Sequence, residues 1–279
     1  MKKIHRRQTG FLFVLPSLLG VLVFIVVPFG DVARRSFTEA VSGAWVGFAN
    51  YRMVFSNTAF RLAAGNTLRF EGICIPLLLA LSLLAALLLN SLDRHMQFFK
   101  SCFLAPMAIP VASAVLLWKV LFHERGILSG FLHMLHFQGS DWMRTPWAFW
   151  ILVASYIWKN LGYNLVLWLA GLSSISPHLY EAARVDGAGR WQCFWHITLP
   201  NLLPSVFTIS ALSILNSFKA FREAYLAAGD YPHESMYLLQ HLFNNWYRDL
   251  SMDKMAAGAT LHAGVIFLLV LFLKWKWDS

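Results

Sequence analysis

The sequence predicts an all-α integral membrane protein with six membrane-spanning helices. Of its 279 residues, 58% are hydrophobic, against roughly 45–50% in an ordinary soluble domain. Only 13% are charged, about half the usual share of about 25%. Six separate apolar stretches come close to the about 20 residues that cross a bilayer as a helix. So few charges cannot cover the surface of a soluble chain of this length, which excludes a soluble enzyme.

The six predicted spans are apolar runs with at most one charge each. In order they are Phe11–Phe29, Gly72–Asn90, Ser101–Trp118, Trp147–Leu172, Pro200–Phe218 and Met255–Leu273. The third is interrupted by two prolines, Pro106 and Pro110, and the fourth carries the single charge of Lys159. The first span exceeds the length of a signal-peptide core and no A-x-A cleavage site follows it, so we expect it to be retained.

No internal repeat divides the chain, and we expect one membrane domain in two parts. Residues 1–66 hold the cytoplasmic N-terminus, the first span and a short helix on the outer membrane surface, for which the apolar residues of Phe48–Phe55 are suited. Residues 67–279 form a core of five helices that includes an inner loop at 173–200.

Charge distribution predicts the orientation. With the start inside, Lys and Arg are nearly twice as dense in the inner connections as in the outer ones, and Lys2, Lys3, Arg6 and Arg7 directly precede the first span. Such a bias places both termini in the cytoplasm. The net charge of +9 is otherwise scattered, so it does not form the basic face that nucleic-acid binding needs.

Catalytic and metal sites are not indicated. Cys74, Cys102 and Cys193 lack C-x-x-C spacing. His123-Glu124 and His233-Glu234 lack a second His at metalloprotease spacing. The chain has no G-x-x-x-x-G-K-[ST] phosphate loop and cannot hydrolyse ATP by that route.

The inner loop has clear helix boundaries. Ser176 is a good N-cap, Pro177 fits the first helical position and Gly187 can take a left-handed stop, which predicts a helix from Pro177 to Asp186. A second short helix should start after Gly189 and end near Thr198, where the chain turns back at Leu199-Pro200. The first helix presents Leu179, Ala182, Ala183 and Asp186 at spacings of three and four. It is either a connector resting on its own domain or a docking helix for a cytoplasmic partner.

This loop resembles the EAA loop of permease subunits of ABC importers. The motif is Glu181-Ala-Ala-x-x-x-Gly187, then nine residues, then Ile197-x-Leu199-Pro200, and Tyr180 with Val185-Asp186-Gly187-Ala188 resembles the maltose and glycerol-phosphate branch. The resemblance covers nearly the whole chain and includes Leu15-Pro16-Ser17, Asn50-Tyr51-Arg52, Asn66-Thr67-Leu68, Leu104–Pro110 and Leu169–Leu172.

The resemblance implies a type I ABC importer permease fold in a bacterial cell membrane. In that family the EAA helix couples the permease to an ATPase subunit, which implies coupling roles for Tyr180, Glu181, Ala182, Ala183, Asp186 and Gly187. The implied partners are a second, homologous permease, two ATPase subunits that bind ATP and Mg, and an extracellular solute-binding protein. No cofactor is expected in this chain, and no enzyme activity.

Polar residues inside the fourth and fifth spans suggest a substrate site, since such groups are costly in a bilayer and usually line a cavity or an interface. The resemblance to maltose-type permeases implies sugar contacts at Trp158, Lys159, Asn160, Tyr163, Ser213 and Ser217, and Asn216 belongs to the same cluster. Met107, Val111 and Ala220 replace residues that are polar in the maltose protein. The alternative is that the aromatic residues form an interfacial belt and the Asn and Ser residues pack helices together.

We therefore expect a membrane subunit of an ATP-driven sugar importer, with a di- or oligosaccharide as substrate. Two rival functions remain. An ion-coupled secondary transporter should place Asp, Glu or His centrally in its spans, and the predicted spans have none there. A structural membrane scaffold does not need the EAA spacing. Lys159 is open to three roles: snorkelling, binding an anionic sugar, or pairing with an acid of the partner permease.

Overall fold

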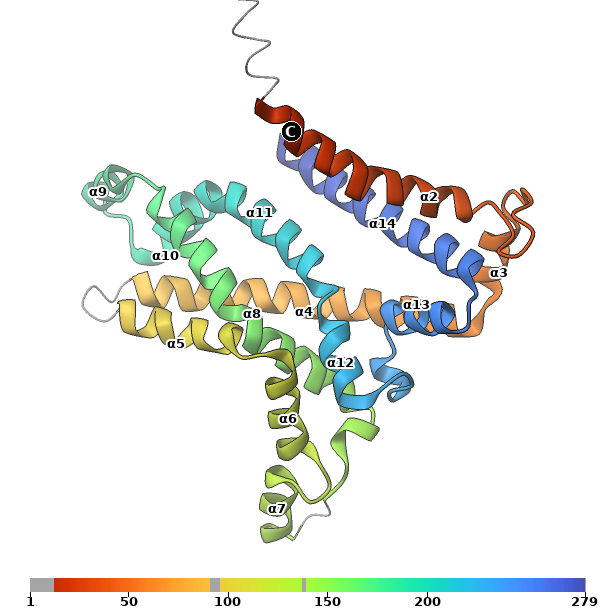
Figure 1. The fold of residues 1–279 in the computed structure, drawn as a ribbon. Coiled ribbons are helices and arrows are strands. Elements are labelled where there is room, and N and C mark those ends of the chain that lie inside the picture. Colours follow the sequence, from red (N-terminus) through yellow and green to blue (C-terminus); the bar gives the residue numbers. More distant parts are fainter. Residues whose placement is uncertain (1–12, 91–95, 137–138, 279) are drawn as a thin grey trace, which may run out of the picture. The chain divides into compact units, whose positions relative to one another are not determined.

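A computed structural model describes residues 13–90, 96–136 and 139–278, and Figure 1 shows its helices. Apart from an isolated β-bridge between Thr38 and Trp45, every regular element in these ranges is a helix. The basic residues at positions 2–7 and the start of the first predicted span lie outside the described residues. The chain divides into two compact units.

The first unit contains the residues up to Arg61 together with Phe243–Phe267. Its first helix runs over Phe13–Arg35 and includes the π-helical turn η1 (Leu22–Val26) and α2 (Val27–Arg35). The short helix α3 (Ala49–Ser56) lies in the segment where the sequence predicts a helix on the outer membrane surface. Its buried Asn50 donates hydrogen bonds to the carbonyls of Ser36 at 3.1 Å and Thr38 at 2.9 Å, which fixes the turn before α3.

The second unit contains Leu62–Leu242 and Leu268–Ser279. Its helices are α4 (Thr58–Asn90), α5 (Met96–Ala108), α6 (Val111–Phe122), α7 (Ile127–Met134), η2 (Trp142–Arg144), α8 (Ala148–Ser173), α9 (Pro177–Val185), α10 (Arg190–Cys193), η3 (Phe194–Thr198), α11 (Leu199–Ser217), α12 (Ala220–Ala228) and η4 (Glu234–Met236). Helix α4 begins four residues before this unit, and two further helices, α13 (Leu239–Arg248) and α14 (Met252–Asp278), also extend across the boundary between the units. The sequence predicts a division at residue 66 that leaves residues 243–267 in the C-terminal part, whereas in the structure these residues belong to the first unit.

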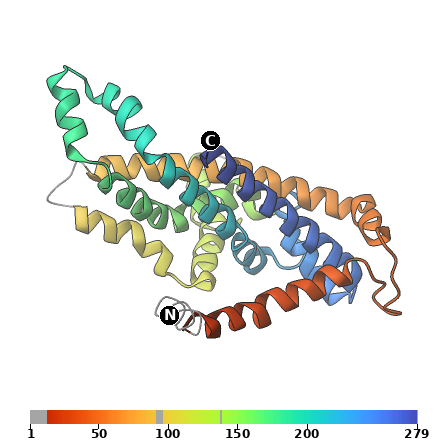
Figure 2. The ribbon, with the colours of Figure 1, turned by 90° about the horizontal axis from the view of Figure 1, so that it is seen from above.

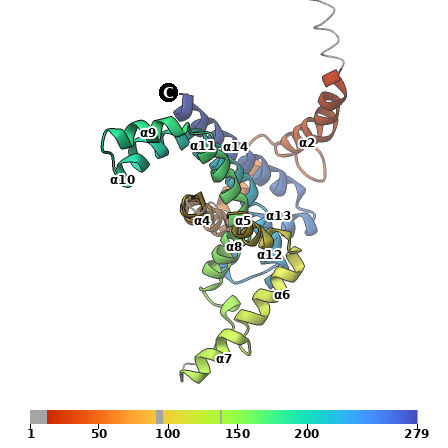
Figure 3. The same cartoon turned by 90° about the vertical axis from the view of Figure 1, so that its left-hand side faces the viewer.

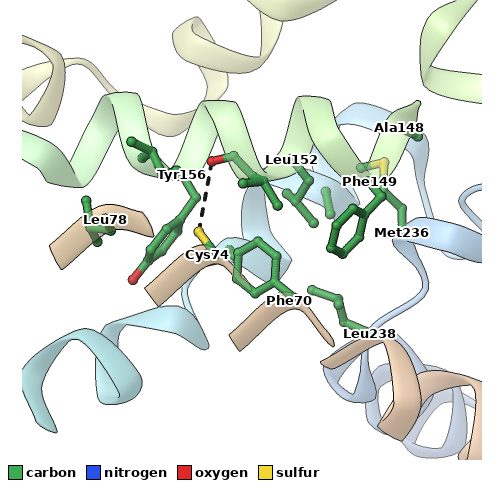
Figure 4. Close-up of a cluster of buried hydrophobic side chains, with 13 residues drawn as sticks. Phe70, Cys74, Leu78, Ala148, Phe149, Leu152, Tyr156, Met236 and Leu238 are labelled. Carbon is green, nitrogen blue, oxygen red and sulfur yellow. Dashed lines mark hydrogen bonds between the residues drawn. The ribbon is translucent and has the colours of Figure 1, made fainter. Parts of the chain in front are cut away.

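The core of the second unit is built on α4 and α8. Phe70, Cys74 and Leu78 are spaced four residues apart and lie on one face of α4, where they meet Phe149 and Tyr156 of α8 (Figure 4). The ring of Tyr156 contacts that of Phe70 edge to face, with the centroids 5.5 Å apart. A second cluster continues along the same two helices, and there the indole of Trp168 donates to Ser82 Oγ at 3.0 Å.

The described parts of the predicted apolar runs lie largely in helices, but among the described residues fewer than six helices have both the length and the apolarity of a span. Four do: Phe13–Arg35, Thr58–Asn90, Arg190–Ala228 and Met252–Trp275. A fifth is the bent pair at Met96–Ala108 and Val111–Met134, if the pair counts as one span. Helix α8 has 26 residues, about 39 Å at 1.5 Å per residue, but its polar middle makes it less apolar than the others.

The third predicted span is broken more sharply than the sequence indicated. Pro106 lies inside α5, whereas Pro110 has the extended ψ of 143° and separates α5 from α6, which meet at an angle of 92°. A residue before proline is driven away from the helical region, so the chain turns at Ile109-Pro110. Figures 1 and 3 show α6 and α7 leading away from α5 at this bend.

The inner loop corresponds to α9 and α10, which lie beyond the same end of α4 and α8 (Figure 2). The expected turn at Leu199-Pro200 is wrong, because the helical backbone continues from Arg190 through η3 into α11. Proline lacks the N–H of a regular helical turn, and the π-helical turn η3 before Pro200 lets the helix continue across it.

Candidate functional site

A pocket of about 440 Å³ lies where the α5–α6 bend meets α8 and the end of α11. The bend contributes Met107, Ala108, Ile109, Pro110 and Val111; α8 contributes Tyr156, Lys159, Asn160 and Tyr163; and the last part comes from Asn216, Lys219, Arg222 and Glu223. We call this the α8–α12 pocket. It combines an apolar wall with a polar wall, which is the composition of a small-molecule site.

The polar wall contains an ion pair. Lys159 Nζ lies 3.2 Å from Glu223 Oε1, and the two side chains are 12% and 8% exposed. The other carboxylate oxygen of Glu223 accepts a hydrogen bond from Ser155 Oγ at 3.2 Å. The charge that stood alone in the fourth predicted span is therefore compensated within the chain, by a residue 64 positions later. Of the three roles open to Lys159, the structure supports pairing, but with an acid of its own chain.

The remaining polar side chains differ in how far their bonding capacity is used. Asn160 Nδ2 donates to the Tyr156 carbonyl at 2.9 Å. Lys219 Nζ donates to Asn216 Oδ1 at 2.6 Å. Arg222 is exposed and forms no ion pair within the described residues. Amide groups and cations at a pocket wall can bind hydroxyl and acidic groups of a ligand.

The structure brings four of the seven predicted substrate contacts to this pocket: Lys159, Asn160, Tyr163 and Asn216. Trp158 is not among the lining residues and packs edge to face on Trp118, with the centroids 5.5 Å apart. Ser213 and Ser217 are buried and used within the fold. Ser213 Oγ accepts from Asn164 Nδ2 at 2.9 Å, and Ser217 Oγ donates to Glu71 Oε1 at 3.2 Å.

Sequence reasoning missed Tyr156, Arg222 and Glu223 as pocket residues. The sequence predicts that the fifth span ends at Phe218, yet the helical path continues through α12 to Ala228. One signal was present: a lysine in an otherwise apolar span needs a counter-ion, and Glu223 was available in the polar segment after the fifth span.

The sequence predicts no acid in the middle of a span, whereas the structure places acids in two of the helices that could span a membrane. Glu71 lies in α4, and Glu223 lies in the helical path that passes the length and apolarity test at Arg190–Ala228. Glu223 pairs with a lysine and Glu71 accepts from a serine. The distribution of acids therefore does not separate the ion-coupled alternative from an ABC importer. What separates them is the α9–α10 loop and the family to which the chain belongs.

Helix α9 ends as the sequence predicts, within one residue. Gly187 has φ of +82°, a conformation that favours glycine. The N–H of Ala188 donates to the Ala183 carbonyl at 2.8 Å, and that of Gly187 to the Arg184 carbonyl at 3.1 Å. These two bonds form a Schellman motif. At the other end Ser176 is the N-cap residue, but its side chain accepts no capping hydrogen bond.

The predicted coupling residues divide into an anchored side and an exposed side. Tyr180 packs on the α4–α8 core, and its hydroxyl bonds Thr198 Oγ1 at 3.0 Å. Glu181 and Ala182 are exposed, and Glu181 lies 3.1 Å from His178 Nδ1. Ala183, Asp186 and Gly187 line a hollow of about 380 Å³ between α9 and α10. Val185 is 87% exposed, so α9 presents an apolar side chain on its surface.

A larger pocket of about 820 Å³ lies at the other end of α12. It is lined by α6, η2 and the Ala228–His233 segment, with Lys119, His123, Arg144, Tyr225 and Tyr231 among its polar residues.

A protein-family comparison connects this architecture to known proteins. Residues 72–274 match the family described as "Binding-protein-dependent transport system inner membrane component". The match includes the α8–α12 pocket and the whole α9–α10 loop, so both candidate sites lie within the family region.

Individual relatives and a solved structure agree with the family match. The chain is 31% identical to the arabinooligosaccharides transport system permease protein AraP of Bacillus subtilis over 278 residues, covering 96% of this chain and 86% of the relative. It is 33% identical to the sulfoquinovosyl glycerol transport system permease protein SmoG of Agrobacterium fabrum, covering 82% and 77%. A chain of the bacterial alginate ABC transporter, crystallised in complex with an alginate pentasaccharide-bound periplasmic protein, matches with a TM-score of 0.81 at 24% identity, covering 98% and 94%.

Proposed function

Because this chain belongs to the inner membrane components of binding-protein-dependent transport systems, we propose that it forms, with a second permease, the membrane path of an ATP-driven sugar importer. The sugar would be delivered by an extracellular binding protein. Permeases of this family are not themselves enzymes, so ATP with its Mg would be bound by two ATPase subunits. The main support for this proposal is that one chain of this family contains both a pocket of about 440 Å³ and a short, largely exposed helix, α9, with the EAA spacing.

We place substrate recognition in the α8–α12 pocket. Asn160, Tyr163 and Asn216 offer groups for sugar hydroxyls there, and the Met107–Val111 segment offers an apolar surface. Three further residues would support the pocket without touching the sugar: Trp158, Ser213 and Ser217. Their contacts hold α6, α11 and α4 against the pocket helices.

We place ATPase coupling on α9. Tyr180 ties the helix to α8 and η3, so a push on the exposed face would be transmitted to the pocket helices. Glu181, Ala182 and the apolar Val185 would contact the ATPase. Ala183 and Asp186 would shape the adjoining hollow, and Gly187 would set the turn. Both termini would lie on this cytoplasmic side.

A glycine series at position 187 tests the coupling role. No atom lies within 4 Å of a Cβ added there, so the effect of a substitution comes from backbone strain alone. A left-handed residue other than glycine or asparagine costs roughly 1–2 kcal/mol. We expect Gly187→Val to reduce ATP-driven uptake in the complete transporter at least tenfold while membrane insertion is kept.

The matched control is Gly187→Asn, which tolerates the left-handed conformation and should retain most uptake. Co-purification of an ATPase with a tagged wild-type chain is the companion measurement. Uptake that ignores ATP and follows an ion gradient, with no ATPase attached to the chain, would favour the ion-coupled alternative and overturn the importer proposal.

A further inference from the structure

The charges of the α8–α12 pocket do not balance. Its lining contains three basic side chains, Lys159, Lys219 and Arg222, and one acid, Glu223. All four lie within the second unit. Among the described residues, the pocket therefore has two more positive charges than negative ones.

The single acid is already committed to the lysine of α8. Glu223 lies 3.2 Å from Lys159 and receives a further hydrogen bond from Ser155. Within the described ranges, Lys219 donates to a neutral amide oxygen, that of Asn216, at 2.6 Å, and forms no ion pair. Arg222 has no carboxylate within ion-pair distance in the part of the chain that the structure describes. The excess charge is therefore localised on Lys219 and Arg222.

These two cations are three residues apart, on one side of the turn between α11 and α12. Both are exposed to the pocket space in this chain, so a ligand can reach them. Charges in membrane-spanning segments are costly and are normally compensated by an opposite charge. An anion entering a partly dry pocket gains more from such a pair than it would in water, and the guanidinium fork suits carboxylate, sulfonate or phosphate oxygens.

We propose that the transported sugar carries an anionic group, which Lys219 and Arg222 bind while Asn160 and Tyr163 contact the rest of the molecule. This rests on the proposed function, because it names the substrate class of the same pocket. The Lys159–Glu223 pair contributes no net charge and instead holds α8 against α12. An uncharged sugar would leave both cations without a counter-ion.

The test compares charged and neutral probes in the complete transporter in proteoliposomes. The probes are arabinotriose as the neutral sugar, and sulfoquinovosyl glycerol and an alginate trisaccharide as the sulfonate and carboxylate. We expect ATP-driven uptake of at least one anionic probe to exceed that of arabinotriose at least tenfold. The double variant Lys219→Gln, Arg222→Gln should lower anionic uptake at least tenfold, and Arg222→Lys should retain most of it.

Arg125→Gln is the matched control, because Arg125 is an exposed cation of the same unit that does not line the pocket. This variant should keep wild-type uptake of the anionic probe. Two outcomes would overturn the proposal: uptake confined to arabinotriose, or equal uptake of the anionic probe by the wild type and the double variant. Either would show that the two cations pair with another group, such as an acid of the second permease. Uptake of any probe without ATP overturns the importer function instead.

Discussion

At the scale of single residues, the charge of Lys159 is compensated by Glu223, which the fold brings from another helix. The two side chains are almost completely buried and 3.2 Å apart. Removing one partner of a buried pair leaves an uncompensated charge and typically costs about 3–5 kcal/mol, whereas removing both costs much less. The pair therefore determines whether α12 can stay against α8.

We expect Glu223→Gln to lower the thermal midpoint of the purified chain sharply, by the loss of about 3 kcal/mol or more of folding free energy. The double variant Lys159→Gln, Glu223→Gln should recover most of this loss. Thermal unfolding in detergent of both single variants and the double variant measures the coupling as a double-mutant cycle. Additive effects would mean that the two residues do not form a pair.

Polarity in the sequence identified several side chains that line one pocket. Asn160, Tyr163 and Asn216 stand out in apolar runs, and the structure places them at one pocket. Trp158 and Ser213 stand out in the same way, yet they are used in packing contacts. Polarity in a span indicates that a group needs a partner, but it does not say whether the partner is a ligand or a neighbouring helix.

At the scale of elements, the approach of α5 to α8 depends on one glycine. A Cβ on Gly162 would lie 2.0 Å from the carbonyl oxygen of Phe103 and 2.5 Å from its carbon. Both are backbone atoms, so no side-chain rotation can relieve the overlap. Gly162 lies between Asn160 and Tyr163, so the close approach also brings α5 to the edge of the α8–α12 pocket. Small residues commonly permit such contacts between membrane helices.

We expect Gly162→Ala to destabilise the chain by about 3 kcal/mol, the upper end of ordinary overpacking costs, and to reduce uptake by separating α5 from α8. Gly72→Ala is the control, because Gly72 lies in α4 and an added Cβ there meets nothing within 4 Å. Alanine at that helical position should be neutral or stabilising by roughly 0.5–1 kcal/mol. Thermal midpoints that fall equally in the two variants would contradict the role of Gly162.

Elements fixed by local chemistry could be predicted, and those fixed by packing could not. The bounds of α9 follow from Pro177 at its first position and Gly187 at its end, which act within a few residues of themselves. The break at Pro110 was predicted as an interruption, but its angle depends on what α6 packs against. The continuation across Pro200 was missed, because a π-helical turn has no clear sequence signature.

At the scale of the whole molecule, the fold class followed from composition, because scarce charge and long apolar runs leave few alternatives. The number of spans is harder to predict. Helix α8 carries the polar groups of the pocket and for that reason lacks the apolarity of a typical span. The residues that give the chain its site thus weaken the signal that would identify it as a membrane helix. The arrangement of the spans is therefore best tested by measuring on which side of the membrane each loop lies.

Single-cysteine labelling tests the proposed orientation. In a chain with Cys74, Cys102 and Cys193 replaced by serine, Ser173→Cys reports the inner end of α8 and Tyr231→Cys reports the loop after α12. Both positions are exposed in this chain, and Tyr231 is 77% exposed. The density of Lys and Arg places the first inside and the second outside. A membrane-impermeant maleimide should label Tyr231→Cys in intact cells and Ser173→Cys only in inside-out vesicles. The reverse pattern would put α9 on the outer face, where no ATPase could reach it, and would remove the physical basis of the coupling mechanism.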